Sequence, residues 1–425
     1  VSIQDKFPEL YQFEEDLGKK VGPMSVMFPL KERLPDIDSY YDSILLESKP
    51  VSPDAIRSAQ REWADIAGIR TRGQRKTVEL MKKSTNSGSP YFTKRSRVVD
   101  KTVPCYITYD GVANNGSSEA ARITQHLPGS TWDCCAVLGW RGQEGGPSFD
   151  DVKQRVIWMF PYALNMRELQ VYQPLIAGCQ KHRLVPAWVG MDAVDAEITQ
   201  LFDTKGADDL IICTDFTKFD QHFNHDMQEC ALDLYQHLLA KDSESKKWLS
   251  NVFPVKYRIP LVVSKDKIVF GDHGMASGSG GTNADETLVH RTLQHEAAYN
   301  AGAILNPHSQ CLGDDGILSY PGITVDDVVQ TYSSHGQVMN ADKQYASTTT
   351  CIYLRRWHHK DYRVNGVCAG VYSTYRALGR LAEQEKFYDP DKWSKEMVTL
   401  RYLSILENVK YHPLREEFVD YCIKG

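Results

Sequence analysis

The most constraining feature of the sequence is a pair of adjacent aspartates, Asp314 and Asp315, placed between two apolar stretches. Cys311-Leu312 precedes the pair and Ile317-Leu318 follows it, which predicts two short strands joined at the aspartates. Neighbouring carboxylates are costly to hold beside a hydrophobic interior, because buried charges are paired or coordinate metals. The sequence therefore predicts a turn whose carboxylates face a cation.

A second acidic cluster ends another apolar run. The run 210–214 leads directly into Asp215, and Asp220 follows shortly after it. Two strand ends that carry carboxylates can bracket a pair of Mg²⁺ ions, which is what two-metal displacement at phosphorus requires. Asp215 and Asp314 are therefore predicted as metal ligands, with Asp315 as a weaker ligand, and the chemistry as nucleotidyl transfer. A pair of surface turns is the alternative.

The charge of the chain is concentrated in clusters. The net charge of −6 over 425 residues does not by itself indicate nucleic-acid binding, but whole-chain charge is a poor guide when basic groups gather locally. Lysines and arginines are dense in 70–83, in 94–101 and in 355–360. These clusters, flanking an acidic centre, fit a funnel for a phosphate backbone, although each alone is more often a solvated face.

The cysteines and apolar runs exclude other classes of protein. None of the 10 cysteines has C-x-x-C spacing, so we expect reduced thiols in a cytosolic compartment and neither a zinc site nor a disulfide framework. The apolar runs are far shorter than the roughly 18 residues that span a bilayer, so no membrane association is expected.

Hydrophobic periodicity and turn residues predict an α+β layer with helices on one face of a sheet. Asn283 is a candidate N-cap for one of the helices. Long loops and short strands are expected in 103–147, and an ordered loop in 84–90. Helices are expected at 53–66, 192–202, 225–239, 283–300, 325–335 and over most of 393–425, and strands at 152–160, 210–214, 259–270, 309–320 and 345–357.

Three segments form an ordered series along the chain: Asp215-x-x-x-x-Asp220, Ser277-Gly278-x-x-x-Thr282 and Gly313-Asp314-Asp315. They resemble motifs A, B and C of viral RNA-dependent RNA polymerases. The sequences around these motifs are CTDFTKFDQHFN, SGSGGTN and CLGDDG. They are most similar to those of the polymerases of picobirnaviruses, which have double-stranded RNA genomes.

The resemblance extends from about residue 84 to residue 357 and implies a right-hand polymerase built around an antiparallel palm sheet. On this basis we expect fingers with an N-terminal extension in 1–190, palm with motif A in 191–239, and a fingers insertion in 240–271. Palm with motifs B, C and D is expected in 272–350, and motif E with the thumb in 351–425.

Asp220 bears on the choice between RNA and DNA substrates. Reverse transcriptases carry a motif similar to motif A, but they place a bulky aromatic at this position. A carboxylate there can accept a hydrogen bond from the 2′-hydroxyl of a ribonucleotide. Many relatives carry an asparagine four residues after the motif B threonine, but Glu286 occupies that position here. Asn283 is therefore our expected partner of Asp220, with a plain helix cap as the alternative.

Basic residues elsewhere resemble motifs that handle the triphosphate. Lys153 and Arg155 alternate along an expected strand, so both point to one face and can grip an incoming nucleotide, with Arg141 as a further candidate. An exposed strand with two cations is the alternative. Lys343 resembles the motif D lysine, which would act as general acid toward pyrophosphate, although a lone lysine is usually a surface residue.

The remaining matches concern RNA and the flexible loop. Arg355 and Arg356 resemble motif E and would contact backbone phosphate, and Ser87-Gly88 resembles motif G at the template entrance. The glycine-dense loop that begins at Ser277 would let backbone approach template or nucleotide. Ser277 and Thr282 are accordingly expected to bind nucleotide.

The resemblance implies template-directed addition of ribonucleoside triphosphates to an RNA 3′-end, with Mg²⁺ or Mn²⁺ as cofactor. Template RNA, nascent RNA and a viral capsid protein are the expected partners, and the virion interior and host cytoplasm the expected locations. Two alternatives remain. A reverse transcriptase would share the metal carboxylates, but Asp220 argues against it, and a non-catalytic RNA-binding virion protein would not need paired aspartates.

Overall fold

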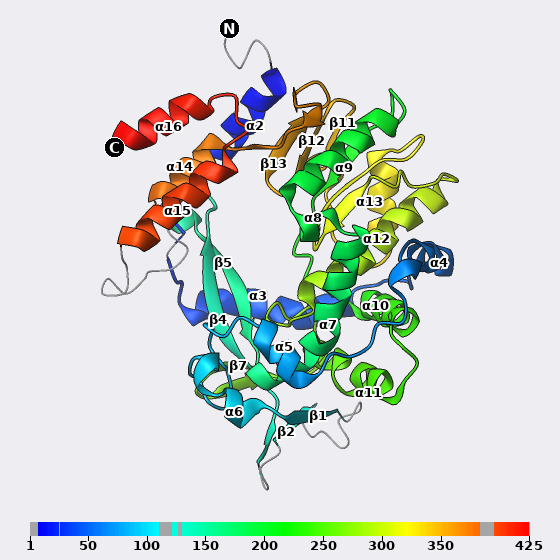
Figure 1. Ribbon diagram of the computed structural model, residues 1–425, viewed down its shortest axis with the longest axis vertical. Coiled ribbons are helices and arrows are strands. Elements are labelled where there is room, and N and C mark those ends of the chain that lie inside the picture. The colour runs from blue at the N-terminus through cyan, green and yellow to red at the C-terminus, as the bar shows by residue number, and fades with distance from the viewer. Residues whose placement is uncertain (1–6, 25, 110–120, 126–129, 383–394, 425) are drawn as a thin grey trace.

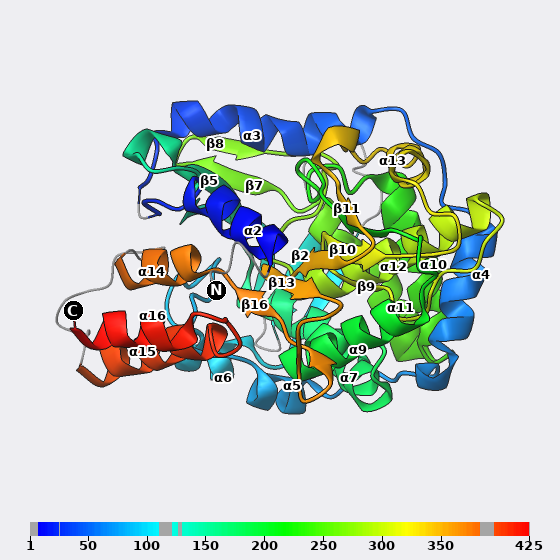
Figure 2. The same cartoon turned by 90° about the horizontal axis from the view of Figure 1, so that it is seen from above.

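The computed structural model describes residues 7–24, 26–109, 121–125, 130–382 and 395–424. The elements are arranged as a ring when viewed down the short axis (Figure 1). Two sheets form opposite parts of this ring, and helices from both ends of the chain lie together at a third part. Figure 2 shows the same arrangement from above, with the N-terminal and C-terminal helices on the same side of the molecule.

The first sheet carries the acidic motifs. Its strand order is β11-β6-β10-β9, and every pair is antiparallel. All four residues of its second strand are buried, as expected for a strand covered on both faces. The strands are β6 (Ile211–Thr214), β9 (Gln310–Leu312), β10 (Asp315–Leu318) and β11 (Tyr345–Ser347).

Helices cover both faces of this sheet. Ile211 and Ile317 pack with Val194 of α9 (Met191–Thr204) in one core cluster. Ile212 lies in a different cluster, with apolar residues of α10 (His225–Leu238) and α12 (Thr282–Asn300). The expected α+β class with an antiparallel sheet is confirmed, but the expectation of helices on one face was wrong, because β6 is apolar at successive positions.

The second sheet joins strands that are far apart in the sequence. Its order is β5-β4-β7-β8, with β4 and β7 parallel and the other pairs antiparallel. The predicted hairpin in 259–270 is therefore present, and it completes a sheet begun more than a hundred residues earlier. The strands are β4 (Ala136–Gln143), β5 (Lys153–Met159), β7 (Leu261–Ser264) and β8 (Lys267–Val269).

Most of the other predicted elements form close to their expected bounds. Trp393 and parts of the predicted loop region 103–147 lie outside the described residues. The helices are α3 (Leu30–Asp42), α4 (Pro53–Glu62), α5 (Gln74–Leu80), α6 (Val99–Thr102), α7 (Tyr162–His182), α8 (Pro186–Val189), α11 (Ser243–Asn251) and α13 (Val325–Ser333), and a small sheet contains β1 (Cys105–Tyr109), β2 (Ala121–Gln125) and β3 (Thr131–Asp133).

The start of α12 differs from its prediction. The helix begins at Thr282, its N-cap is Gly281, and no side chain caps it. Gly281 is required here because a Cβ would lie 2.1 Å from the ring of Tyr172. Asn283 therefore lies inside the first turn and is not the cap.

The two ends of the chain pack together. Glu14 of α2 (Pro8–Gly18) accepts hydrogen bonds from Ser373 Oγ at 2.8 Å, Thr374 N at 2.9 Å and His412 Nε2 at 2.7 Å. α2, which falls in the expected N-terminal extension of the fingers, therefore packs with the C-terminal part of the chain. The C-terminal elements are β12 (Thr350–Tyr353), β13 (Arg356–His359), β14 (Arg363–Val364), β15 (Val367–Cys368), β16 (Val371–Tyr372), α14 (Thr374–Ala382), α15 (Lys395–Asn408) and α16 (Arg415–Lys424).

The cysteines are thiols rather than disulfides. All 10 cysteines are free, and most of them are buried. In the part of the chain that the structure describes, no helix is long and apolar enough to cross a membrane.

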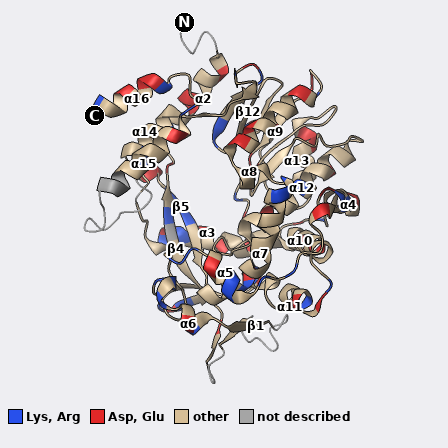
Figure 3. Ribbon diagram, viewed as in Figure 1, with Lys and Arg blue, Asp and Glu red and all other residues tan. Residues whose placement is uncertain are grey.

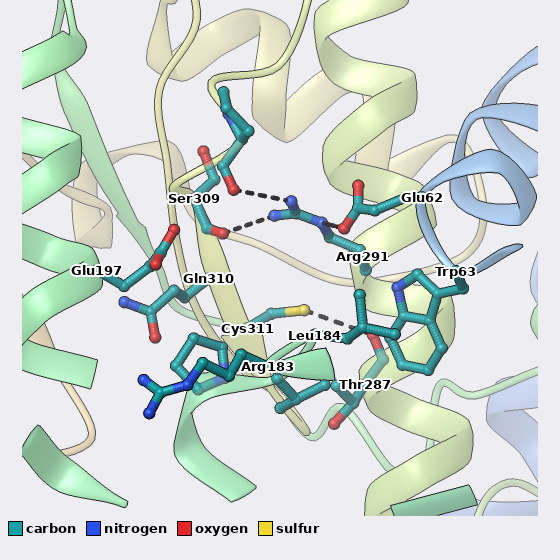
Figure 4. A pocket seen from close by; sticks show the side chains of 13 residues that line it. Glu62, Trp63, Arg183, Leu184, Glu197, Thr287, Arg291, Ser309, Gln310 and Cys311 are labelled. Atoms are coloured by element: carbon teal, nitrogen blue, oxygen red, sulfur yellow. Dashed lines mark hydrogen bonds and ion pairs between the residues drawn. The ribbon is translucent and has the colours of Figure 1, made fainter. Parts of the chain in front are cut away.

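An ion pair between the buried Arg291 and the partly buried Glu62 joins α4 to α12 behind the first sheet. Arg291 Nε donates to Glu62 Oε1 at 2.7 Å and its Nη1 donates to the Ser309 carbonyl at 2.6 Å, beside a cavity of about 200 Å³ (Figure 4). Burial alone would raise the pKa of Glu62, but the charge of Arg291 and hydrogen bonds from His295 and Arg291 lower it to about 2. The ion pair therefore ties α4 to the helix behind β9.

This ion pair predicts acid sensitivity. The depressed pKa means that Glu62 stabilises the fold fully above its ordinary pKa of 4.5, and that this contribution is lost as the pH falls toward about 2. Glu62→Gln is expected to be less stable than the parent at pH 7 and nearly as stable at the lowest pH. Urea unfolding of both proteins across this range measures the difference, and a gap that did not change with pH would contradict the assignment.

Candidate active site

The two aspartates of the Gly-Asp-Asp sequence are placed by a tight hairpin. β9 and β10 are joined by Gly313 and Asp314 alone, since Leu312 pairs with Asp315. Gly313 has a φ of 59°, a conformation that such two-residue loops require and glycine adopts readily. The predicted turn between strands is therefore confirmed.

The neighbouring strand brings the third aspartate to the same edge. Thr214 of β6 pairs with Gly316 of β10, so the next residue, Asp215, lies beside Asp315. The end of β6 and the start of β10 thus meet at one edge of the sheet. This register brings together Asp215 and the Gly-Asp-Asp turn, the two acidic clusters that were predicted to share a cation.

Two polar residues of α12 hold the hairpin turn. Thr287 Oγ1 accepts a hydrogen bond from Gly313 N at 2.9 Å, and His290 Nδ1 donates to the Gly313 carbonyl at 2.8 Å. Burial lowers the pKa of His290 to about 4, so the imidazole is neutral at pH 7. Sequence reasoning missed both residues, because α12 carries polar side chains along its whole length and no spacing singles these two out.

The side-chain amide of Gln344 fixes the backbone of Asp215 with two hydrogen bonds. Its Oε1 accepts from Asp215 N at 2.7 Å, and its Nε2 donates to the Asp215 carbonyl at 2.9 Å. The predicted motif D residue, Lys343, is the preceding residue and is exposed at the end of a short 3-10 turn. Sequence reasoning selected the lysine and missed the glutamine that contacts the motif.

Asp315 is turned toward the β12–β13 hairpin. Its Oδ2 accepts from Leu354 N at 2.8 Å, and Leu354 and Arg355 at the hairpin tip have φ of 52° and 64°. Burial raises the pKa of Asp315 to about 7, an effect that the Leu354 hydrogen bond opposes and that the charge of Asp314 increases. This bond engages one of the two carboxylate oxygens, and the weaker ligand role of Asp315 stays a prediction.

The electrostatics of the carboxylates suit a cation. Asp314 reaches solvent at the turn, but the protein around it desolvates the carboxyl and raises its pKa, as do the charges of Asp220 and Asp215, while Arg155 lowers it. Among the described residues, no three His, Cys, Asp or Glu side chains are placed to hold a metal by themselves. Mg²⁺ typically takes one or two carboxylates and completes its shell with substrate phosphates, so the donor set fits.

A cavity of about 780 Å³ opens beside these carboxylates. Lysines and arginines gather on β5 at the inner side of the ring (Figure 3). The cavity therefore combines Asp314 of the β9–β10 turn and Asp220 of the turn after β6 with cations from the second sheet. Its charged lining residues are Glu32, Arg33, Asp36, Lys153, Arg155, Lys218, Asp220, Asp314 and Arg355.

The predicted cations of β5 share one face. Lys153 and Arg155 are exposed, while Val156 is buried. Arg141 of β4 pairs directly with Arg155, so its side chain lies on the same face. Arg155 Nη2 lies 3.9 Å from Asp220 Oδ2, which places the predicted triphosphate and ribose residues side by side.

The α3 helix supplies charged residues that the sequence did not suggest. Arg33 Nη2 donates to the Gly139 carbonyl of β4 at 2.8 Å, and Lys218 Nζ donates to Asp36 Oδ1 at 2.9 Å. Lys218 has a φ of 53° and belongs to the turn between Asp215 and Asp220. The helix therefore connects the second sheet to the acidic turn along one wall of the cavity.

The hydroxyls of the glycine-dense loop bind protein groups. Ser277 Oγ donates to the Val156 carbonyl at 3.3 Å, and Thr282 Oγ1 donates to the Ala276 carbonyl at 3.1 Å. A Cβ on Gly278 would lie 1.5 Å from the Trp158 carbonyl, so the loop packs directly on β5. In this structure both hydroxyls donate to backbone carbonyls of the protein, and their role in nucleotide binding stays a prediction.

Glu168 of α7 also holds this loop. Its carboxylate accepts hydrogen bonds from Ser279 Oγ and from Gly280 N, the latter at 3.1 Å. Glu168 is fully buried, and burial raises its pKa to about 7 against the opposing charge of Lys256. Sequence reasoning did not single out this residue, because an isolated glutamate in a helix carries no motif.

The expected contact between Asn283 and Asp220 is not formed in this structure. Its Oδ1 accepts from Trp188 Nε1 at 2.9 Å, and the residue is exposed. Glu286 lies one turn further along α12, and burial, followed by the charge of Asp220, raises its pKa well above the usual range. The helix starts at Thr282, which turns Asn283 toward α8 and Glu286 toward the acidic turn.

Three residues that were predicted to contact RNA have structural contacts instead. Ser87 is buried and its Oγ accepts from Thr93 N at 3.1 Å, and a Cβ on Gly88 would lie 2.6 Å from the Phe160 carbonyl. Arg356 is buried, and its guanidinium donates to both oxygens of Asp195 at 2.8 and 2.7 Å. Their assignment to RNA binding was wrong, because all three are packed inside the protein. Arg355 is exposed and lines the cavity.

Comparisons with known proteins agree with this geometry. The family model for viral RNA-dependent RNA polymerase matches residues 67–369. The chain belongs to this family. A potential RNA-dependent RNA polymerase of a human picobirnavirus is 61% identical over 425 residues, which is 100% of this chain and 78% of that protein.

Solved structures give the same assignment. The crystal structure of the RNA-dependent RNA polymerase of a human picobirnavirus matches with a TM-score of 0.95 and 61% identity, covering 100% of this chain and 79% of that one. An insertion loop deletion mutant of such a polymerase gives a TM-score of 0.96 at 61% identity, covering 100% and 82%. The right-hand polymerase fold and the RNA polymerase function predicted from the sequence are therefore confirmed, and the two alternative functions are not favoured. Polymerases of this family use divalent metal ions.

The contrast between Arg355 and Arg356 gives a matched pair of variants. Arg356→Met leaves the buried Asp195 without its bidentate partner, so a loss of about 3–5 kcal/mol in unfolding free energy is expected. Arg355→Met removes an exposed side chain, so stability should change by under about 0.5 kcal/mol. Urea unfolding measures both changes. Equal stability of the two variants would contradict the structural role of Arg356.

Proposed function

We propose that Asp215 and Asp314 hold divalent metal ions for nucleotidyl transfer, with Mg²⁺ as the resident ion and Mn²⁺ as a substitute. The observation that carries the proposal is the β6–β10 register, which puts Asp215 beside the Gly-Asp-Asp turn. Bound ions would make the RNA 3′-hydroxyl a better nucleophile and neutralise charge on the triphosphate and leaving pyrophosphate. The two carboxylates orient these groups at the edge of the sheet.

The cations of β5 bind the triphosphate in this proposal. Lys153, Arg155 and Arg141 share one face of the second sheet, and the first two line the cavity that Asp314 also lines. Phosphate oxygens between these cations and the carboxylate edge would be held for in-line attack. Asp220, at the same cavity, accepts a hydrogen bond from the ribose 2′-hydroxyl.

Further assignments rest on position alone. Arg355, exposed at the hairpin tip beside Asp314, contacts phosphate of the nascent strand, and Lys343 protonates pyrophosphate as it leaves. Residues 191–239 and 272–350 act as palm, 240–271 as part of the fingers, and 351–425 as motif E and thumb, now joined by α2. The protein works in the virion interior and host cytoplasm with a capsid protein as partner.

Replacing Asp314 tests the metal assignment. Asp314→Asn keeps the size of the side chain and removes its charge, so polymerisation on an RNA template with all four ribonucleotides should fall by on the order of a thousandfold. Asp361→Asn, at an exposed residue outside the cavity, is the matched control and should retain activity. Polymerisation that survived in Asp314→Asn would rule out the ligand role.

Replacing Lys153 tests the triphosphate site. Lys153→Met should raise KM for ribonucleotides about tenfold, because one charged contact with phosphate is lost, and should leave RNA affinity nearly unchanged. Lys267→Met, on the exposed β8 strand of the same sheet, is the control. KM from single-nucleotide extension and RNA affinity from fluorescence anisotropy separate the two effects. Equal loss of both would contradict the role.

A further inference from the structure

Arg33 of α3 is a buried arginine that no carboxylate of the described residues neutralises. Only 8% of its surface is exposed, and its one printed contact is the hydrogen bond from Nη2 to the Gly139 carbonyl at 2.8 Å. Its Nε is buried and has no hydrogen-bond partner among the described residues. Arginine is almost never buried unless it is paired, so this side chain is suited to an anion that the protein itself does not supply.

The nearby carboxylates of α3 do not offset the charge of Arg33. Asp36 Oδ1 accepts a hydrogen bond from Lys218 Nζ at 2.9 Å, and Glu32 is exposed to solvent. Burial lowers the pKa of Arg33 from its ordinary value. A guanidinium nevertheless stays protonated in proteins, so the cost of burying its charge is retained.

Arg33 lines the cavity of about 780 Å³ that Lys153, Arg155 and Asp314 also line. It reaches this cavity from α3, whereas the two other cations belong to β5. α3 precedes residues 67–369, which match the family model. The charge of Arg33 is therefore added to the proposed nucleotide cavity by an element outside the matched region.

The burial of Arg33 favours a terminal phosphate over a phosphodiester of RNA. A terminal phosphate has three oxygens without a further substituent, so it can approach a buried side chain and accept two hydrogen bonds from one guanidinium. A phosphodiester within RNA has a ribose on each side, and both would have to approach the same buried group. The smaller and more highly charged phosphate is therefore the better ligand for Arg33.

We propose that Arg33 binds the terminal phosphate of the incoming ribonucleoside triphosphate from the α3 side of the cavity, while Lys153 and Arg155 bind the triphosphate from β5. This inference rests on the proposed function, because it requires the triphosphate to lie in this cavity. The bound triphosphate supplies the negative charge that Arg33 lacks within the protein. Arg33 thereby favours nucleotides that carry a terminal third phosphate over diphosphates of the same base.

Methionine and lysine at position 33 provide a matched test. Methionine keeps a long unbranched side chain without charge, and lysine keeps the charge without the planar guanidinium. Lys31→Met, at an exposed cation of the same helix outside the cavity, is the control. Single-nucleotide extension gives KM for the ribonucleotide. Inhibition constants are measured for a non-hydrolysable triphosphate and for the diphosphate of the same base, RNA affinity by fluorescence anisotropy, and folding by thermal unfolding.

Arg33→Met is expected to raise both KM and the inhibition constant of the non-hydrolysable triphosphate about tenfold, because one charged contact with phosphate is lost. The inhibition constant of the diphosphate should change by less than about threefold, and Lys31→Met should leave every constant unchanged. Arg33→Lys should stay within about threefold of the parent, because it keeps the charge. The unfolding temperature of Arg33→Met should not fall, since the variant removes a buried charge without a partner.

Three results would overturn the proposal. The first is a lower unfolding temperature of Arg33→Met with unchanged nucleotide constants, which would make the role structural. The second is equal weakening of triphosphate and diphosphate, and the third is a loss of RNA affinity as large as the loss of nucleotide affinity, which would assign Arg33 to RNA. If the methionine protein does not fold, Arg33→Gln replaces it in the same assays.

Lys153→Met, measured in the same assay, separates this inference from the function on which it rests. A raised KM in Lys153→Met with an unchanged KM in Arg33→Met would remove the role of Arg33 alone. An unchanged KM in both variants would show that the triphosphate does not lie in this cavity, and would remove the triphosphate site of the proposed function together with the role of Arg33.

Discussion

The antiparallel pairing of β6 with β10 is the constraint on which the active site depends. Because Thr214 lies opposite Gly316, both strands present their aspartates at one edge of the sheet. Gly316 also lets His290 approach, since a Cβ there would lie 2.6 Å from the imidazole ring. A shift of one residue in this register would turn Asp215 to the opposite face and separate the carboxylates.

In the proposed function, the carboxylates act together with charges from a separate sheet. Lys153 and Arg155 depend on β5, which is held by β4 and, through it, by β7 from a much later part of the chain. The glycine-dense loop packs on β5 as well, through the close approach of Gly278 to Trp158. In the proposed function, the fold therefore couples the triphosphate, ribose and metal positions through shared backbone contacts, and not through the side chains of each motif alone.

The sequence predicted the ordered carboxylates, the class of fold and most helices, because these depend on local periodicity and on charges that are costly to bury. It failed where long-range packing decides a role. Arg356 was predicted to contact RNA, but its guanidinium donates two hydrogen bonds to the buried Asp195 of α9. The roles of Gln344 and Glu168 could not be predicted from the sequence, because they come from contacts with segments far away along the chain. Asn283 was expected beside Asp220, but α12 begins at Thr282 after Gly281, and Asn283 accepts a hydrogen bond from Trp188 instead.

The most direct test of this account is to locate the metal. A crystal structure of the protein with an RNA primer–template, a non-hydrolysable ribonucleotide and Mn²⁺ gives anomalous peaks at the ions. The account predicts peaks that contact the carboxylates of Asp215 and Asp314 and the nucleotide phosphates, with phosphates facing Lys153 and Arg155. Ordered nucleotide with manganese bound elsewhere, or with either aspartate out of contact, would contradict it.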